Sequence, residues 1–142
     1  MAVILTNLLQ QQIFEQMEAT FPNEGGGFLL GIGTGADRQI EAVIQIENVF
    51  ETEEQYHRYA MTPQNWMKIE DEADGRGLSV LGYYHSHPNH PAIPSEFDRE
   101  HALPNFVYII TSVMEGKAAE MLAWQLAANR DTFFVLDLLL VD

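Results

Sequence analysis

The amino-acid sequence predicts an α/β fold with an α+β mixed sheet, in one domain covering residues 1–142. Two segments combine helix-start signals with helical spacing, and several short apolar runs have strand-like alternation and end in turn residues. A chain of 142 residues is long enough to bury a core but too short for a barrel of eight βα units. We therefore expect one domain with a single compact site.

The N-terminal half contains a predicted helix followed by a predicted hairpin. Thr6 or Asn7 can cap a helix to about Thr20, because apolar residues recur in it at four-residue spacing. The stretch PNEGGG then leads into the apolar run FLLGIG, and a turn connects this run to the alternating QIEAVIQIENV. The glycine cluster matches neither phosphate-binding loop pattern, so we interpret it as serving turns and close packing.

The C-terminal half contains a second helix, a central strand and three further strands. Thr62 followed by proline predicts the start of a helix over QNWMKIEDEAD. LSVLGYYHS alternates and predicts a strand over residues 78–86, after which three prolines exclude a helix until Ser95 begins a short one. FVYIITSV, AEMLAWQLA and TFFVLDLLLV are the remaining strand candidates, separated by turns.

Composition and charge exclude several functional classes. The apolar runs are shorter than the roughly 20 residues that a membrane-spanning helix needs, and the first residues lack a basic leader. We therefore expect a soluble, cytoplasmic protein without a membrane partner. The net charge of −14 disfavours nucleic-acid binding, and either serves solubility or attracts a basic face of a protein partner. The absence of cysteine leaves His, Asp and Glu as metal ligands.

The stretch YYHSHPNHPAIPSEFD, residues 83–98, contains three of the five histidines. On a strand, residues i and i+2 point to the same side, so His85 and His87 would project together. A zinc ion that holds a reactive water needs a third protein ligand, for which Asp98 is the nearest candidate. The alternative interpretation is structural, because Ser95 and Asp98 also match a helix capping box.

The compound pattern His-Ser-His, seven residues, then Ser-x-x-Asp resembles the motif of the JAMM, or MPN-plus, zinc metalloprotease family. Upstream, FPNEGGGFLLG is similar to the family's P-x-E-x-x-G-x-L-x-G stretch and places Glu24 at its glutamate. The resemblance extends from the N-terminal helix to about Trp124. It implies a cytidine-deaminase-like JAB1/MPN fold, with a central, mostly antiparallel β-sheet flanked by helices.

The resemblance also implies a role for each motif residue. His85, His87 and Asp98 would bind one zinc ion per chain. Glu24 would orient and deprotonate the water at the fourth position, and a positioned carboxylate suits that task. Ser95 would help to hold the tetrahedral oxyanion while also capping its helix.

The three remaining histidines receive no catalytic role. His90 lies between prolines in the loop, where an exposed position is expected rather than ligation. His101 falls one helical turn after Asp98 and could support the site without binding metal. His57 lies in a polar stretch and is assigned no role.

The short, cysteine-free chain resembles stand-alone bacterial members of the family rather than the deubiquitinating members, which carry insertions. We therefore expect a zinc metallopeptidase that hydrolyses the peptide or isopeptide bond after the C-terminal Gly-Gly of a ubiquitin-like sulfur carrier protein, in cysteine or sulfur-cofactor synthesis. The extended tail would add to a sheet edge, and only glycine would pass a narrow channel beside the metal. Two alternatives stay open, a deubiquitinase-like isopeptidase and a non-catalytic, zinc-retaining MPN module that binds proteins.

Overall fold

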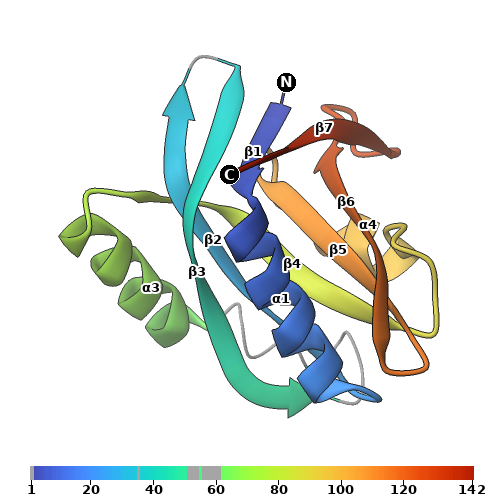
Figure 1. The fold of residues 1–142 in the computed structure, drawn as a ribbon. Coiled ribbons are helices and arrows are strands. Elements are labelled where there is room, and N and C mark those ends of the chain that lie inside the picture. Colours follow the sequence, from blue (N-terminus) through green and yellow to red (C-terminus); the bar gives the residue numbers. More distant parts are fainter. Residues whose placement is uncertain (1, 35, 51–54, 56–61) are drawn as a thin grey trace.

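The computed structural model describes residues 2–34, 36–50, 55 and 62–142, and His57 lies outside these residues. Helices and strands are mixed along the chain, with a hairpin after the first helix and three consecutive strands at the C-terminal end, as the sequence predicts (Figure 1). The elements are β1 (Ala2–Thr6), α1 (Asn7–Thr20), β2 (Glu24–Thr34), β3 (Asp37–Phe50), α3 (Pro63–Gly75), β4 (Ser79–Pro88), α4 (Glu96–His101), β5 (Val107–Met114), β6 (Lys117–Leu126) and β7 (Phe133–Val141).

The strands form one mixed sheet in the order β1-β3-β2-β4-β5-β6-β7, and this sheet is closed because β1 also pairs with β7. The ladders β2/β3, β2/β4, β5/β6 and β6/β7 are antiparallel, whereas β4/β5, β1/β3 and β1/β7 are parallel. The expectation of a central sheet flanked by helices was therefore incomplete. Strand β1 is not predicted from the sequence, since its four apolar residues directly before a helix carry too little alternation to identify a strand.

The two long helices begin where their capping residues predict. The Thr6 side chain accepts a hydrogen bond from the Leu9 N–H at 3.1 Å, which caps α1. In the same way, the Thr62 side chain accepts a hydrogen bond from the Asn65 N–H at 3.2 Å and caps α3. Each threonine thus satisfies one backbone donor that the first helical turn leaves without a partner.

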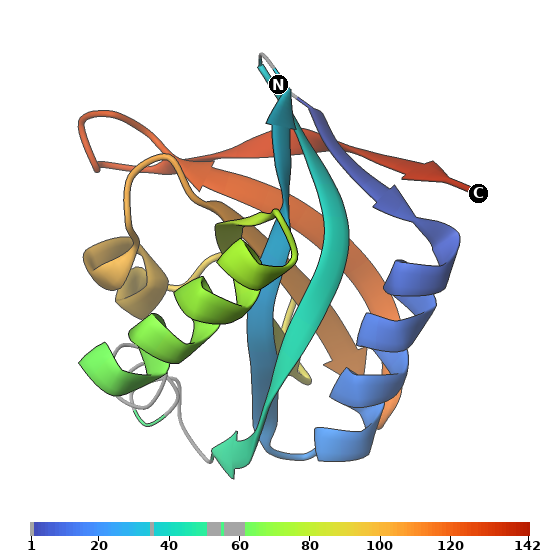
Figure 2. The same ribbon diagram turned by 90° about the vertical axis from the view of Figure 1, so that its left-hand side faces the viewer.

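A hydrophobic core lies on each face of the central strands. Helix α1 packs through Met17 into the larger core, and α3 packs through Ile69 into the smaller core beside Phe28. Tyr83 belongs to the smaller core and Tyr84 to the larger one, so β4 is buried on both faces. Figure 2 shows β3 passing between the two helices. The strand that carries the histidines is therefore held firmly inside the molecule.

The glycine cluster lies inside β2 rather than ahead of it, which corrects the predicted start of this strand. A Cβ atom on Gly27 would overlap the carbonyl oxygen of Ile44 on β3. A Cβ atom on Gly82 of β4 would likewise overlap the backbone of Val107 on β5. The interpretation that these glycines permit close packing is confirmed at Gly27, because the neighbouring backbone occupies the side-chain position.

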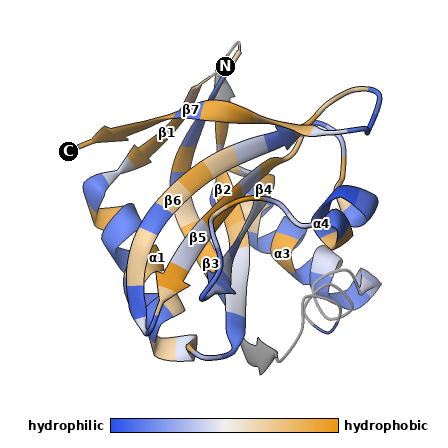
Figure 3. Cartoon of the chain, turned by 90° about the vertical axis from the view of Figure 1, so that its right-hand side faces the viewer, coloured by the Kyte–Doolittle hydropathy of each residue, from blue (hydrophilic) through white to orange (hydrophobic). Residues whose placement is uncertain are grey.

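Strand β7 has an apolar outer surface, and Figure 3 shows hydrophobic colour along much of its length. Among the described residues, no helix is both long enough and apolar enough to cross a membrane. The exposed large apolar residues of β7 are Phe134, Val135, Leu139, Leu140 and Val141.

Candidate metal centre

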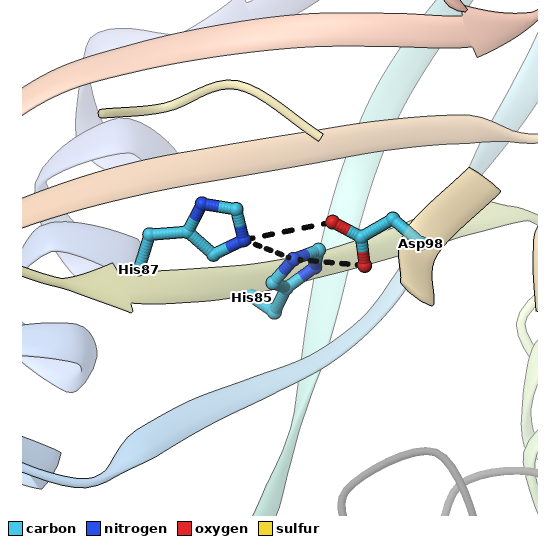
Figure 4. Close-up of side chains that lie close together, drawn as sticks. All are labelled: His85, His87 and Asp98. Atoms are coloured by element: carbon cyan, nitrogen blue, oxygen red, sulfur yellow. Dashed lines mark hydrogen bonds and ion pairs between the residues drawn. The ribbon is translucent and has the colours of Figure 1, made fainter. Parts of the chain in front are cut away.

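Two histidines project from the same face of β4 near its C-terminal end (Figure 4). His85 and His87 lie two positions apart on this strand, and only 6% and 5% of their surfaces are exposed. Their Nε2 atoms are 3.2 Å apart. Strand β4 cannot easily move at this point, because His85 pairs in the sheet with Gly26 of β2 and with Ile110 of β5. The two imidazoles are therefore presented to a common point by a buried strand.

Asp98 completes a group of three ligand-type side chains, as the sequence predicts. It lies in α4, and Figure 4 shows its carboxylate facing both imidazoles. Asp98 Oδ1 lies 3.5 Å from His85 Nε2, and Asp98 Oδ2 lies 3.5 Å from His87 Nε2. One ligand atom from each of the three residues lies within 4.8 Å of the other two. Asp98 of α4 and the two histidines of β4, which lie more than ten positions earlier, thus converge on one point.

The arrangement of these atoms fits a tetrahedral zinc ion. Zinc binds nitrogen and oxygen ligands at about 2.0–2.2 Å, which places neighbouring ligand atoms roughly 3.3–3.5 Å apart. The 3.2 Å separation of the two Nε2 atoms is close to this spacing. Each imidazole also lies 3.5 Å from one carboxylate oxygen, Oδ1 for His85 and Oδ2 for His87, so the two distances to Asp98 belong to different oxygens. Two imidazoles and one carboxylate also match a zinc site that keeps its fourth position open.

The orientation of the His87 ring is set by the backbone of the following loop. His87 Nδ1 lies 3.0 Å from the carbonyl oxygen of Pro91. Because a carbonyl only accepts hydrogen bonds, Nδ1 carries the hydrogen and donates it. In the neutral ring, the lone pair then lies on Nε2, which faces His85 and Asp98. The hydrogen bond at Nδ1 therefore leaves Nε2 of the same ring oriented and available to bind a metal.

The Asp98 carboxylate serves the capping box and faces the histidines at the same time. Its Oδ2 accepts a hydrogen bond from the Ser95 N–H at 2.8 Å, and the Asp98 N–H donates to Ser95 Oγ at 3.0 Å. Burial alone would raise the pKa of Asp98. When the two rings are protonated, the charge of His85, the hydrogen bonds from both histidines and the Ser95 N–H outweigh burial and hold this pKa well below its usual range. The structural and functional interpretations of the motif are thus compatible.

Helix α4 is short and is fixed in place from its C-terminal side. The Arg130 guanidinium, in the turn between β6 and β7, donates to the carbonyl oxygens of Glu100 at 3.3 Å and Ala102 at 3.1 Å. Arg99 in turn donates to the Arg130 carbonyl at 3.0 Å. This exchange of hydrogen bonds joins α4 to the turn, so the position of Asp98 depends on a segment about 30 residues later.

The two predicted catalytic residues line a pocket next to this group. Glu24 is the first residue of β2 and is half-buried, and Ser95 caps α4. Both line a pocket of about 390 Å³. The full lining is Glu24, His87, His90, Pro91, Ile93 and Ser95. Glu24, Ser95 and His87 therefore border the same space.

The other described histidines differ in their relation to the site. His90 is exposed, as expected, and it also lines the pocket, a position that its sequence context does not indicate. His101 is also exposed, and its Nδ1 donates to the Phe97 carbonyl at 3.0 Å while its ring stacks on the Phe97 ring. His101 is thus engaged with its own helix. The role of the Pro91 carbonyl was also missed, although the density of prolines signals a rigid loop.

Comparison with known proteins agrees with this geometry. The family described as prokaryotic homologs of the JAB domain matches residues 6–127. The chain is 34% identical over 92 residues to a curated protein of Haloferax volcanii named desampylase, in an alignment covering 64% of this chain and 63% of that protein. It is 35% identical over 89 residues to the "Probable TtuB-protein conjugate cleaving protease" of Thermus thermophilus, covering 63% of this chain and 55% of that protein. The chain therefore matches less than two thirds of the length of each curated relative.

Solved structures share the fold over the whole chain. A protein from Salinibacter ruber is 36% identical with a TM-score of 0.76, in an alignment covering 100% of this chain and 92% of that one. A JAB1/MPN domain protein from Archaeoglobus fulgidus is 18% identical with a TM-score of 0.59, covering 100% of both chains. At that identity, the similarity demonstrates a common fold.

Proposed function

Because this chain belongs to the family of prokaryotic homologs of the JAB domain, we propose that it is a zinc-dependent metallopeptidase. Its proposed reaction is hydrolysis of the peptide or isopeptide bond after the C-terminal Gly-Gly of a ubiquitin-like sulfur carrier protein. One observation carries the proposal: His85, His87 and Asp98 converge beside a pocket that Glu24 and Ser95 line.

The side chains of the site divide the chemistry among them. Zinc held by His85, His87 and Asp98 would polarise the scissile carbonyl and lower the pKa of a water at the open position to about 7. The Glu24 carboxylate accepts the proton of the attacking water and returns it to the leaving amine. The Ser95 hydroxyl donates a hydrogen bond to the oxygen on which negative charge develops. Both residues line the pocket beside His87, and these roles require their side chains to come within hydrogen-bond distance of the water and of the oxyanion there.

The names of the two curated relatives support a conjugate as the substrate. The Thermus protein is named for cleaving a protein conjugate, and the Haloferax protein is named desampylase. We infer the same substrate class for this chain, a ubiquitin-like carrier joined to another group through its C-terminus. We keep the expectation that the extended carrier tail adds to a sheet edge and that only glycine passes beside the metal. The closed strand order does not exclude this, because the β1/β3 ladder pairs only Val3 with Arg38 and Ile4 with Gln39.

A cleavage assay with two substrates tests the proposal against its alternatives. The zinc-loaded chain is incubated with a carrier extended beyond its Gly-Gly and, separately, with ubiquitin chains, and products are identified by mass. We expect cleavage of the carrier directly after Gly-Gly, and loss of that cleavage with a strong chelator. Cleavage of ubiquitin chains alone would favour the deubiquitinase-like isopeptidase. Cleavage of neither substrate by a zinc-loaded, folded chain would favour the non-catalytic binding module.

A further inference from the structure

The loop after β4 is fastened to the sheet through three consecutive carbonyl groups. Ser112 Oγ donates to the His90 carbonyl at 2.6 Å, and the Trp124 indole N–H donates to the Ala92 carbonyl at 2.9 Å. Between them, the Pro91 carbonyl accepts the hydrogen bond from His87 Nδ1 at 3.0 Å. The three donors belong to β5, β6 and β4, which are neighbours in the sheet. The loop therefore lies across three strands and is attached to each of them.

From this arrangement we propose that Ser112 and Trp124 are positioning residues for His87. They hold the carbonyl groups on either side of Pro91, and thereby fix the Pro91 oxygen that selects the tautomer and the orientation of the His87 ring. Each of the two side chains donates its hydrogen bond to a carbonyl group of the loop. Their effect on the site passes through the backbone of the loop.

The composition of the loop explains why donors from outside are needed. Prolines at positions 88, 91 and 94 have no N–H, so the loop has few donors for hydrogen bonds of its own. Its carbonyl groups still require partners where they are shielded from water. Ala92 is fully buried and Ser112 is 4% exposed, so these partners lie where water cannot easily replace them.

The sheet register places the two donors correctly for this task. Ser112 is the direct partner of His87 in the parallel ladder between β4 and β5, so both side chains rise from the same face. Trp124 lies on β6 opposite Tyr108, two pairs along the same face from Ser112. His87, Ser112 and Trp124 therefore meet the loop from one surface of the sheet.

Removing either donor should loosen the Pro91 carbonyl and broaden the range of His87 orientations. Partners of metal-binding histidines typically change metal affinity by about 10–100-fold when they are removed. Ser112 and Trp124 are one step further away, since each holds the carbonyl next to the one that His87 uses. We therefore expect each single substitution to weaken zinc binding by about tenfold, near the lower end of that range.

The test uses Trp124→Phe, which keeps an aromatic ring but removes the indole donor, and Ser112→Ala. Trp66→Phe, in the smaller core, and Ser79→Ala, at the exposed start of β4, are the matched controls. The first measurement is the His87 tautomer in the zinc-free chain, from long-range ¹H–¹⁵N NMR correlations at mildly alkaline pH, assigned with His87→Ala. The second is the zinc dissociation constant from competition with a chelator. Thermal unfolding of every sample separates loss of position from loss of fold.

We expect the wild type and both controls to hold the His87 hydrogen on Nδ1, and the two test variants to show a mixture of tautomers with weaker zinc binding. An unchanged tautomer and a dissociation constant within twofold of wild type, in a folded Ser112→Ala variant, would overturn the inference even if Trp124→Phe failed to fold. The inference rests on the proposed zinc site, but its failure is distinguishable. A chain that behaves as expected here and cleaves no carrier would retain the positioning role and lose the proposed function.

Discussion

The backbone N–H of Gly25 donates a hydrogen bond to the side-chain oxygen of Ser86 at 3.0 Å, and both residues are buried. Ser86 lies between the two histidines on β4, and Gly25 directly follows Glu24 on β2. The β2/β3 ladder shifts its register between Glu24 and Gly26, so the Ser86 hydroxyl serves the backbone where the ladder is irregular. This bond connects the strand that carries the proposed base to the strand that carries the imidazoles.

Ser86→Ala tests the strength of this connection. The substitution leaves the buried Gly25 N–H without its partner, which should lower the free energy of unfolding by about 1–3 kcal/mol. The exposed Ser79→Ala change on the same strand should alter it by no more than about 0.5 kcal/mol. Denaturant unfolding of the three proteins measures both values. Equal stability of the two variants would show that the hydroxyl does not support the start of β2.

Zinc content tests the convergence of His85, His87 and Asp98. We expect about one zinc ion per chain after reconstitution at neutral pH, because two imidazoles and a carboxylate are already arranged for it. The double variant His85→Ala, His87→Ala should retain almost none, whereas His101→Ala should retain as much as wild type. Elemental analysis of dialysed protein measures the zinc bound per chain. Full zinc content in the double variant would place the metal elsewhere in the chain.

Zinc affinity should fall as the pH is lowered from neutral toward the acid range. Protons compete with zinc for imidazole, and a protonated ring cannot bind a metal. Burial acts to raise the pKa of Asp98, but its interactions with the two histidines hold that pKa below the usual range, so this carboxylate stays ionised. Asp98→Asn should therefore weaken zinc binding at every pH, and its zinc affinity should change with pH as steeply as that of the wild type. The measurement is the zinc dissociation constant from neutral to acid pH. A constant that did not change with pH in the wild type would contradict the proposed site.

The folded-state pKa of Asp98 also has a consequence for stability. Because it is depressed, the carboxylate stabilises the native state above its unfolded pKa of about 3.9, and this stabilisation is lost as the pH falls further. The acid weakening of zinc binding expected above that pH therefore belongs to the imidazoles.

Gly82→Ala tests the close approach of β4 and β5. The added methyl group would overlap the backbone of Val107, so the strands must separate, which typically costs about 1–3 kcal/mol or more. Gly75→Ala is the matched control, because a Cβ there meets no atom within 4 Å at the end of α3. The control should be neutral or slightly stabilising. The measurement is the melting temperature of each variant. An equal decrease in both would contradict the close packing of β4 against β5.

Features that depend on local signals could be predicted from the sequence. The helix starts follow from Thr6 and Thr62, whose side chains cap the first turns. The proximity of His85 and His87 follows from the two-residue period of a strand. In contrast, β1 was missed because its apolar residues could belong to a strand or a helix, and the closing ladder depends on pairing with the opposite end of the chain.

The contacts that support the site could not be predicted, because they join segments distant in sequence. Arg130 meets the end of α4 about 30 positions away, and Trp124 meets the loop at Ala92. Nothing in the neighbouring residues identifies these partners, which depend on the sheet order β4-β5-β6. Sequence motifs thus indicated the proposed ligands, whereas the arrangement of the sheet determines what holds them.

Glu24→Gln tests the central claim most directly, since an amide can hydrogen-bond to water but cannot accept its proton. The variant and wild type are compared on a carrier extended beyond its Gly-Gly, with bound zinc and melting temperature measured on the same samples. We predict that cleavage falls by about two to four orders of magnitude while zinc content and melting temperature stay unchanged. Cleavage within threefold of wild type, or loss of both zinc and fold, would contradict the claim that Glu24 is the base of a zinc peptidase.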